Sequence, residues 1–157
     1  ILNQSNIMDN ICLPSYDKIK QGIYIAPKAE KNLAEQESNV LKIKMSSLKQ
    51  LCGQLSGGNK QKVALAKWLG NDSDILILDC PTRGIDVGAK AEIHQLLRKL
   101  SNEGISIVVI SSEMPELLGM CDRIYVMSEG RLAGEFTAEE ATQERIMASI
   151  MQEQNKK

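Results

Sequence analysis

The sequence lacks the marks of several protein classes. Its apolar runs, such as Ile105–Ile110, are far shorter than the roughly 20 residues that cross a bilayer. Its start shows no basic, apolar and cleavage regions of a signal peptide. No long block of one charge occurs, and 19 basic and 20 acidic residues leave a net charge of −1. We therefore expect no membrane-spanning segment and no nucleic-acid partner.

Closely spaced metal ligands are also missing. The four cysteines lie far apart and show no metal-ligand spacing: Cys12, Cys52, Cys80 and Cys121. This distribution favours reduced thiols in a cytoplasmic protein over disulfides or a structural metal site.

What is present is an ordinary globular composition, with 43% hydrophobic and 25% charged residues. A chain of 157 residues can form one domain that buries roughly 70% of its unfolded surface.

The segment 1–54 differs from the rest. It predicts a helix from Ser5 or Asn6 through Ile11 ended by Pro14, a surface helix over Pro27–Leu41 and a polar, irregular linker over Lys42–Gly53.

From Leu55 onward, strands alternate with helices. The pattern predicts a helix that follows Gly57 and Gly58 and ends near Gly70, and a helix capped by Asp86 with a stripe of Ile93, Leu96, Leu97 and Leu100. It also predicts helices over Pro115–Gly119 and Thr142–Met151, and strands over Asp74–Asp79, Ile105–Ile110, Arg123–Met127 and Leu132–Phe136. This alternation predicts an α/β fold with a mostly parallel sheet that is buried on both faces by flanking helices. The basic stretch Lys60–Lys67 is expected to be a solvated helix face.

The first motif is LSGGNKQKVALAKWL, over Leu55–Leu69. Small residues followed by a helix make an anion site, because the free backbone N–H groups and the positive helix end point the same way. Gly57 and Gly58 let a phosphate approach the backbone, and Ser56 can donate a hydroxyl hydrogen bond. A bare S-G-G is usually a linker, but S-G-G followed by N-x-Q-K and a helix is far more specific.

The second motif is ILILDCPTRGID, over Ile75–Asp86. An aspartate at the end of an apolar strand is where nucleotide-hydrolysing folds hold Mg²⁺. Taken alone, Asp79 would more often be a strand-end or capping residue. Its combination with the first motif favours a nucleotide site.

The two motifs together resemble the ATP-binding cassette (ABC) ATPase family, a branch of the P-loop NTPase fold. LSGG, an apolar strand ending in Asp and P-T-x-G-x-D follow the family pattern over Leu55–Phe136. TRGIDVGAKAEI (Thr82–Ile93) and SSEMPELLGMCDRI (Ser111–Ile124) are similar to the second cassette of two-cassette proteins that drive ribose, galactose or xylose uptake. The resemblance divides the chain into a helical subdomain and linker (1–54), the cassette core (55–136) and a C-terminal helix and tail (137–157).

The resemblance implies a role for each motif residue. The signature residues would close on the γ-phosphate of ATP held by a partner cassette: Ser56, Gly57, Gly58 and Asn59. Asp79 would assist Mg²⁺ in this chain's own site. Gly84, Ile85 and Asp86 would form the loop that contacts the partner cassette. ATP and Mg²⁺ are the cofactors that follow from these roles.

Two positions depart from the family pattern. The residue after the Mg²⁺ aspartate is normally Glu, which activates the attacking water, but here it is Cys80. A thiol is a poor base for water, and losing such a group costs about 10²–10⁴-fold in rate. We expect Cys80 to be a small buried hydrophobic residue at a strand end. The switch position, usually His, is Ser112 in the run Ser111–Glu113; this substitution resembles the sugar-importer second cassettes.

A third departure is larger, because no G-x-x-x-x-G-K-S/T phosphate loop occurs in the sequence. In the family fold, the strand that carries this loop lies between the strands matching Ile105–Ile110 and Arg123–Met127. Without it, two strand edges would stay unpaired, so we expect a partial cassette of low stability that has no ATPase activity alone.

Three interpretations remain open from the sequence. The first is a piece of a sugar-importer ATPase, peripheral at the cytoplasmic face of the inner membrane, whose partners are a first cassette, membrane permease subunits and, indirectly, a sugar-binding protein. The second is a DNA-repair or chromosome-organising ATPase, which the lack of heptads and of positive charge disfavours. The third is a truncated product without transport activity, which fits a start at Ile1. The sequence alone does not separate the first from the third.

Overall fold

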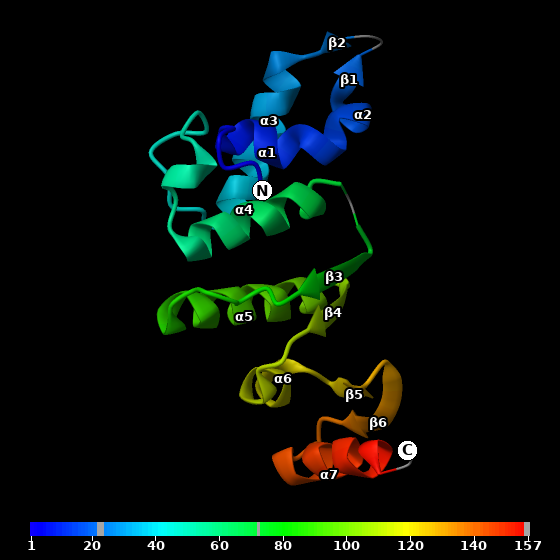
Figure 1. Cartoon of the computed structure of the whole chain (residues 1–157). Coiled ribbons are helices and arrows are strands. Elements are labelled where there is room, and N and C mark those ends of the chain that lie inside the picture. The colour runs from blue at the N-terminus through cyan, green and yellow to red at the C-terminus, as the bar shows by residue number, and fades with distance from the viewer. Residues whose placement is uncertain (22–23, 72, 156–157) are drawn as a thin grey trace. The chain divides into compact units, whose positions relative to one another are not determined.

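The chain divides into two units, Ile1–Val108 and Val109–Lys157. The computed structural model describes residues 1–21, 24–71 and 73–155 (Figure 1). Helices and strands follow one another in both units, so the predicted α/β class is confirmed.

The first unit begins with short helical segments. Asn6 caps α1 (Ile7–Cys12), because its side-chain oxygen accepts a hydrogen bond from the Asp9 N–H at 2.8 Å. The α-helix ends at Cys12, close to the end predicted before Pro14, but Pro14 does not end helical structure. Pro14 instead lies at the start of the 3₁₀ helix η1 (Leu13–Ser15), where its fixed φ suits a first helical position, and α2 (Tyr16–Ile19) continues from it.

The unpredicted strands β1 (Lys20–Gln21) and β2 (Tyr24–Ile25) form an antiparallel pair before α3 (Pro27–Val40). The start of α3 at Pro27 is confirmed. Its expected surface character is only half right, because α3 packs against α1 and α4 and buries Ala34 and Ser38. After α3 the chain is irregular, as predicted, up to η2 (Cys52–Gln54).

Two longer helices follow, α4 (Gly57–Leu69) and α5 (Val87–Asn102). The predicted apolar stripe of α5 is confirmed, with Ile93, Leu96, Leu97 and Leu100 all buried. Asp86 caps α5 by accepting a hydrogen bond from the Ala89 N–H at 2.9 Å. α4 packs against α1, α3 and α5, so it is the helix around which the first unit is assembled.

Strands β3 (Ile75–Asp79) and β4 (Ser106–Ile110) are neighbours in a two-stranded sheet and are joined through α5. The expectation that this sheet is buried on both faces was wrong. Leu76 is 4% exposed, whereas Ile75 and Ile77 are 62% and 70% exposed. Side chains alternate between the faces of a strand, so this pattern means that one face is covered and the other is open. β4 and β5 belong to different two-stranded sheets in the described chain, as the missing strand predicts.

The second unit is a hairpin covered by a helix. β5 (Arg123–Ser128) pairs antiparallel with β6 (Arg131–Thr137), as predicted. α6 (Met114–Met120) precedes the hairpin and α7 (Gln143–Gln154) packs on it. Its buried core is Ile124, Val126 and Ile146. No described helix in either unit is both long and apolar enough to cross a membrane.

Candidate functional site

The first candidate site is the start of α4. Ser56 is the N-cap residue, with φ −62° and ψ 158°, and its side chain is exposed. A serine here usually accepts a hydrogen bond from a first-turn N–H, but in the described structure no side chain caps α4. The first N–H groups of a helix have no partner within the helix, and they carry its positive end. This end of α4 is therefore suited to an anion.

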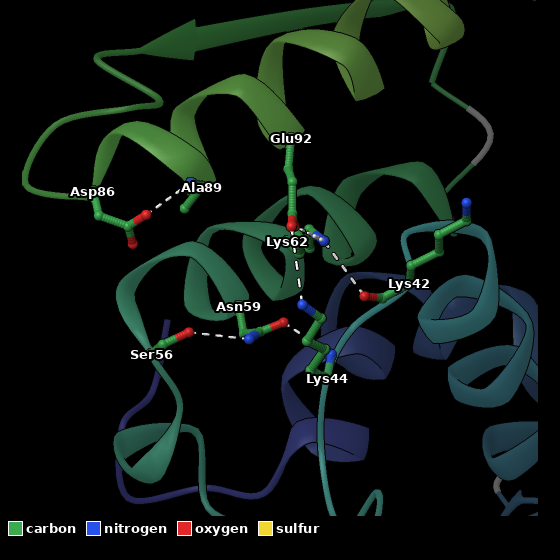
Figure 2. Close-up of polar contacts among 8 residues, drawn as sticks. All are labelled: Lys42, Lys44, Ser56, Asn59, Lys62, Asp86, Ala89 and Glu92. Atoms are coloured by element: carbon green, nitrogen blue, oxygen red, sulfur yellow. Dashed lines mark hydrogen bonds and ion pairs between the residues drawn. The ribbon is translucent and has the colours of Figure 1, made fainter.

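The Ser56 side chain instead forms a hydrogen bond with Asn59. The Asn59 amide nitrogen donates to the Ser56 Oγ at 3.0 Å, and the Asn59 Oδ1 accepts from the backbone N–H of Lys44 at 2.8 Å (Figure 2). One side chain thus joins the start of α4 to the segment that follows α3.

The two signature glycines lie against the segment that precedes and begins α5. A Cβ atom on Gly57 would lie 3.0 Å from the Ile85 Cγ2, and one on Gly58 would lie 2.7 Å from the Ala89 Cβ. Real Cβ atoms essentially never approach a neighbour within 3.0 Å. Gly58 is therefore required for the close packing of α4 on α5, and this packing places the signature beside the predicted dimer-contact loop.

A buried lysine adds a second connection. The Lys62 side chain is 8% exposed, and its Nζ lies 2.8 Å from the Glu92 Oε2 on α5 and 3.4 Å from the Lys42 carbonyl oxygen (Figure 2). The Lys44 Nζ lies 3.9 Å from the other Glu92 oxygen. The hydrogen bond from Lys62, its positive charge and that of Lys44 lower the pKa of Glu92. The expected solvated face of Lys60–Lys67 was therefore wrong at Lys62.

The second candidate site is the end of β3. Asp79 is its last residue and is exposed. Cys80 follows with φ 47°, in the left-handed region that non-glycine residues seldom adopt, and the chain then turns so that the Arg83 N–H donates to the Cys80 carbonyl oxygen at 3.1 Å. Cys80 is half-buried, so the expectation of a buried residue was wrong. Pro81 and Thr82 are the buried residues of this turn, with Thr82 at 1% exposure.

The switch position lies in the second unit. Ser112 is exposed after β4. Its neighbour Ser111 donates to a Glu116 carboxylate oxygen at 2.7 Å and accepts from the Glu113 N–H at 3.0 Å. These bonds fix the backbone before α6.

A magnesium ion at Asp79 would depend on ligands from outside the described chain. No group of three or more His, Cys, Asp or Glu side chains in the described ranges could hold a metal. Mg²⁺ commonly takes only one or two carboxylates and completes its shell with water and substrate phosphates. A single exposed carboxylate at a strand end fits that mode of binding.

The structure thus brings Ser56–Asn59 together with Gly84–Asp86 in the first unit. Sequence reasoning missed Lys44, Lys62 and Glu92, which hold this arrangement. A signal for Lys62 was available, since it shares a helix face with Asn59 and Ala66 at spacings of three and four residues, and Ala66 belongs to the apolar side.

Comparison with known proteins identifies relatives of this chain. A family model described as ABC transporter matches residues 2–83. The chain is 51% identical over 142 residues to the xylose import ATP-binding protein XylG of Thermoanaerobacter pseudethanolicus, covering 90% of this chain and 28% of that protein. It is 50% identical over 143 residues to the ribose import ATP-binding protein RbsA of Lactococcus lactis subsp. cremoris, covering 90% and 29%. The chain spans less than a third of these relatives.

Solved structures support the same fold. The ATP-binding cassette MJ0796, in a dimeric post-hydrolysis state bound to ADP and Pi, superposes with a TM-score of 0.74 at 24% identity, over 88% of this chain and 59% of that one. An inward-facing putative metal-chelate type ABC transporter gives a TM-score of 0.83 at 14% identity, over 95% and 59%. At such identities the likeness concerns the fold alone. Together with the family match over Leu2–Arg83, it shows that this chain belongs to the ABC transporter family and has part of the ATP-binding cassette fold.

Proposed function

We propose that the chain is part of the ATP-binding subunit of an ABC sugar importer and corresponds to its second cassette. In this role, Ser56–Asn59 form the signature that completes an ATP site on a partner cassette. Relatives named as xylose, ribose and arabinose import proteins support the substrate class. The specific sugar would be selected by the permease and the sugar-binding protein.

The observation that carries this proposal is the uncapped start of α4. Ser56 is exposed, its oxygen does not cap the helix, and the first-turn N–H groups point out of the positive helix end. A γ-phosphate held by a second cassette would receive hydrogen bonds from these groups. Gly57 and Gly58 let this helix end lie close to Ile85 and Ala89, because their missing side chains would face those residues.

The Gly84–Asp86 loop supports the same role. Gly84 has φ 75° and open space around it, while Ile85 contacts Gly57 and Asp86 caps α5. The loop is thereby held beside the signature, where a partner cassette that carries ATP would meet both segments. We propose Gly84, Ile85 and Asp86 as the dimer contact.

The chain's own hydrolytic side is proposed to be weak. Mg²⁺ neutralises charge that develops on the phosphates, and Asp79 is the residue that would orient it. Cys80 in place of a carboxylate cannot activate water well, and Ser112 replaces the switch histidine. We expect no Mg²⁺-dependent ATP hydrolysis above background by the purified chain; measurable turnover would contradict this assignment.

The proposed partners imply where in the cell the chain would act. The chain would work with a first cassette in the same or a homologous polypeptide, and with membrane permease subunits. It would then lie peripherally at the cytoplasmic face of the membrane. No specific observation favours the alternative of a DNA-associated ATPase.

The test uses a graft in which this chain replaces the matching segment of the Thermoanaerobacter xylose import protein, assembled with its permease. Ser56→Arg is expected to abolish transport and to reduce ATP hydrolysis at least about 100-fold. The substitution removes the hydroxyl, and the guanidinium fills the phosphate position. ATP binding by the first cassette should be unchanged. The control is Ser101→Arg, at an exposed serine of α5. Normal transport by the Ser56→Arg graft would overturn the proposal.

A further inference from the structure

We propose that Asn59 is a positioning residue, which fixes the Ser56 hydroxyl as a hydrogen-bond donor to a ligand that can only accept, such as a phosphate oxygen. The inference rests on the proposed function and assigns a specific task to one signature side chain. It follows from the direction of two hydrogen bonds around Asn59.

The first bond fixes the orientation of the amide. A backbone N–H can only donate, so the Asn59 atom 2.8 Å from the Lys44 nitrogen must be the carbonyl oxygen Oδ1. The amide nitrogen Nδ2 then necessarily faces Ser56, at 3.0 Å from its Oγ. The ambiguity that usually attends an asparagine amide is removed here by its neighbour.

The second bond fixes the role of the hydroxyl. The amide nitrogen Nδ2 can only donate a hydrogen bond, so the Ser56 Oγ is the acceptor. A hydroxyl has one hydrogen, and it is left to be donated elsewhere. Ser56 is exposed, and among the described residues its hydroxyl donates no hydrogen bond, so this hydrogen is available to an acceptor outside the chain. A phosphate oxygen, which has no hydrogen to give, matches that polarity.

The segment that orients Asn59 is itself held. The Lys62 Nζ lies within hydrogen-bond distance of the Lys42 carbonyl and of Glu92, and Lys42 has the left-handed φ of 50°. The Lys44 Nζ also lies near Glu92. The ion pair between the buried Lys62 and the exposed Glu92 thus helps to keep the Lys44 N–H in place, and this N–H keeps the Asn59 amide in one orientation (Figure 2).

A purely structural role for Asn59 gives a different expectation. In that case Asn59 would only tie the Lys44 segment to α4, and any substitution would harm stability and activity together. The two roles are separated by an isosteric change that keeps the bond to Lys44 and reverses the bond to Ser56.

Asn59→Asp is that change. A carboxylate still accepts from the Lys44 N–H, but it cannot donate to Ser56, so the hydroxyl turns inward to donate to it. In the graft, we expect Asn59→Asp to lower kcat for ATP hydrolysis about 10–100-fold with little change in melting temperature. Asn59→Ala should lower kcat only a few-fold, since the hydroxyl stays free to rotate, while its melting temperature falls.

A double-mutant cycle with Ser56→Ala separates the hydroxyl from the added negative charge. Most of the effect of Asn59→Asp should disappear in the Ser56→Ala background. Equal loss in both backgrounds, no effect of Ser56→Ala alone, or parallel loss of kcat and stability in Asn59→Asp and Asn59→Ala would each overturn the inference. If Ser56→Arg abolishes turnover and Asn59→Asp is silent, only this inference fails; if Ser56→Arg is silent, the proposed function fails and the inference falls with it.

Discussion

The start of α4 and the end of β3 lie in the same unit, and they differ in how they are held. At the start of α4, Asn59 bonds two segments and Gly58 packs directly on α5. At the end of β3, Asp79 is exposed and Cys80 has a left-handed backbone conformation. The first region is fixed in a geometry suited to present a surface to a ligand. The second has the exposed carboxylate that we propose for Mg²⁺, followed by a thiol.

This contrast fits the proposed function, in which the chain contributes to an ATP site of a partner cassette and hydrolyses ATP poorly itself. The packing of α4 depends on residues of this chain alone, whereas the Asp79 side requires phosphates and water to complete a metal shell. The following predictions alter one region at a time, from the largest expected effect to the smallest.

Restoring a carboxylate at position 80 should reduce the difference between the two regions most. In the graft, Cys80→Glu is expected to raise the hydrolysis rate of this cassette's own site by about 100-fold, since a general base contributes about 10²–10⁴-fold. The rate should be measured under single-turnover conditions. Cys80→Gln, which has nearly the same shape and no basic group, is the matched control, and an equal gain from both variants would exclude the base explanation.

Crowding the α4–α5 contact should destabilise the signature region. In Gly58→Ala the new methyl group would meet the Ala89 Cβ, so the free energy of unfolding is expected to fall by about 1–3 kcal/mol in urea titrations of the chain. Ala89→Gly in the same chain should recover part of the loss. Gly119→Ala, in a helix with open space around the glycine, is expected to be neutral or slightly stabilising. A neutral Gly58→Ala would show that the close contact does not matter.

Removing the buried lysine tests the second connection. Lys62→Met keeps the apolar stem but leaves the Lys42 carbonyl and Glu92 without the ammonium, and should lower the free energy of unfolding by about 1–2 kcal/mol. Lys99→Met breaks an exposed pair with Glu103 on α5 and should cost at most about 0.5 kcal/mol. Similar losses of unfolding free energy in the two variants would show that Lys62 contributes no more to stability than an exposed lysine.

The smallest effect concerns pH. Hydrogen bonding and charge from Lys62 lower the pKa of Glu92 in the folded chain below its ordinary value of 4.5. The resulting stability is present above that ordinary value and is lost as the pH falls through the folded pKa. Glu92→Gln should therefore flatten the fall in melting temperature between about pH 5 and pH 3. In a Lys62→Met background the same substitution should change this slope little, and an unchanged slope in both backgrounds would argue against the linkage.

Local signals in the sequence predicted much of the fold. Asn6, Asp86 and Thr142 all cap helices through a side-chain oxygen, and capping depends only on neighbouring residues. The hairpin β5–β6 was also predicted. Its turn has positive φ at Glu129 and Gly130, the geometry that two-residue hairpin loops prefer.

What depends on distant segments was not predictable. Apolar strands over Ile75–Asp79 and Ser106–Ile110 suggested burial on both faces. An apolar sequence shows that a strand face favours burial, but it does not show whether another segment of the chain covers that face. Lys62 was placed with its exposed neighbours because a buried ammonium needs a partner, and Glu92 is 30 residues away. The motif residues of the candidate site were found from sequence, whereas the side chains that hold them required coordinates.

The open face of β3 has a consequence for handling the isolated polypeptide. Ile75 and Ile77 are exposed on it together with the Asp79 carboxylate at the strand end, and Val108 of the adjacent β4 is 49% exposed. Such surfaces attract one another between molecules, and salts that strengthen apolar association favour precipitation. Solubility should therefore fall steeply with concentration and sulfate, and lysines at Ile75 and Ile77 should extend the shelf life of the sample without altering α4.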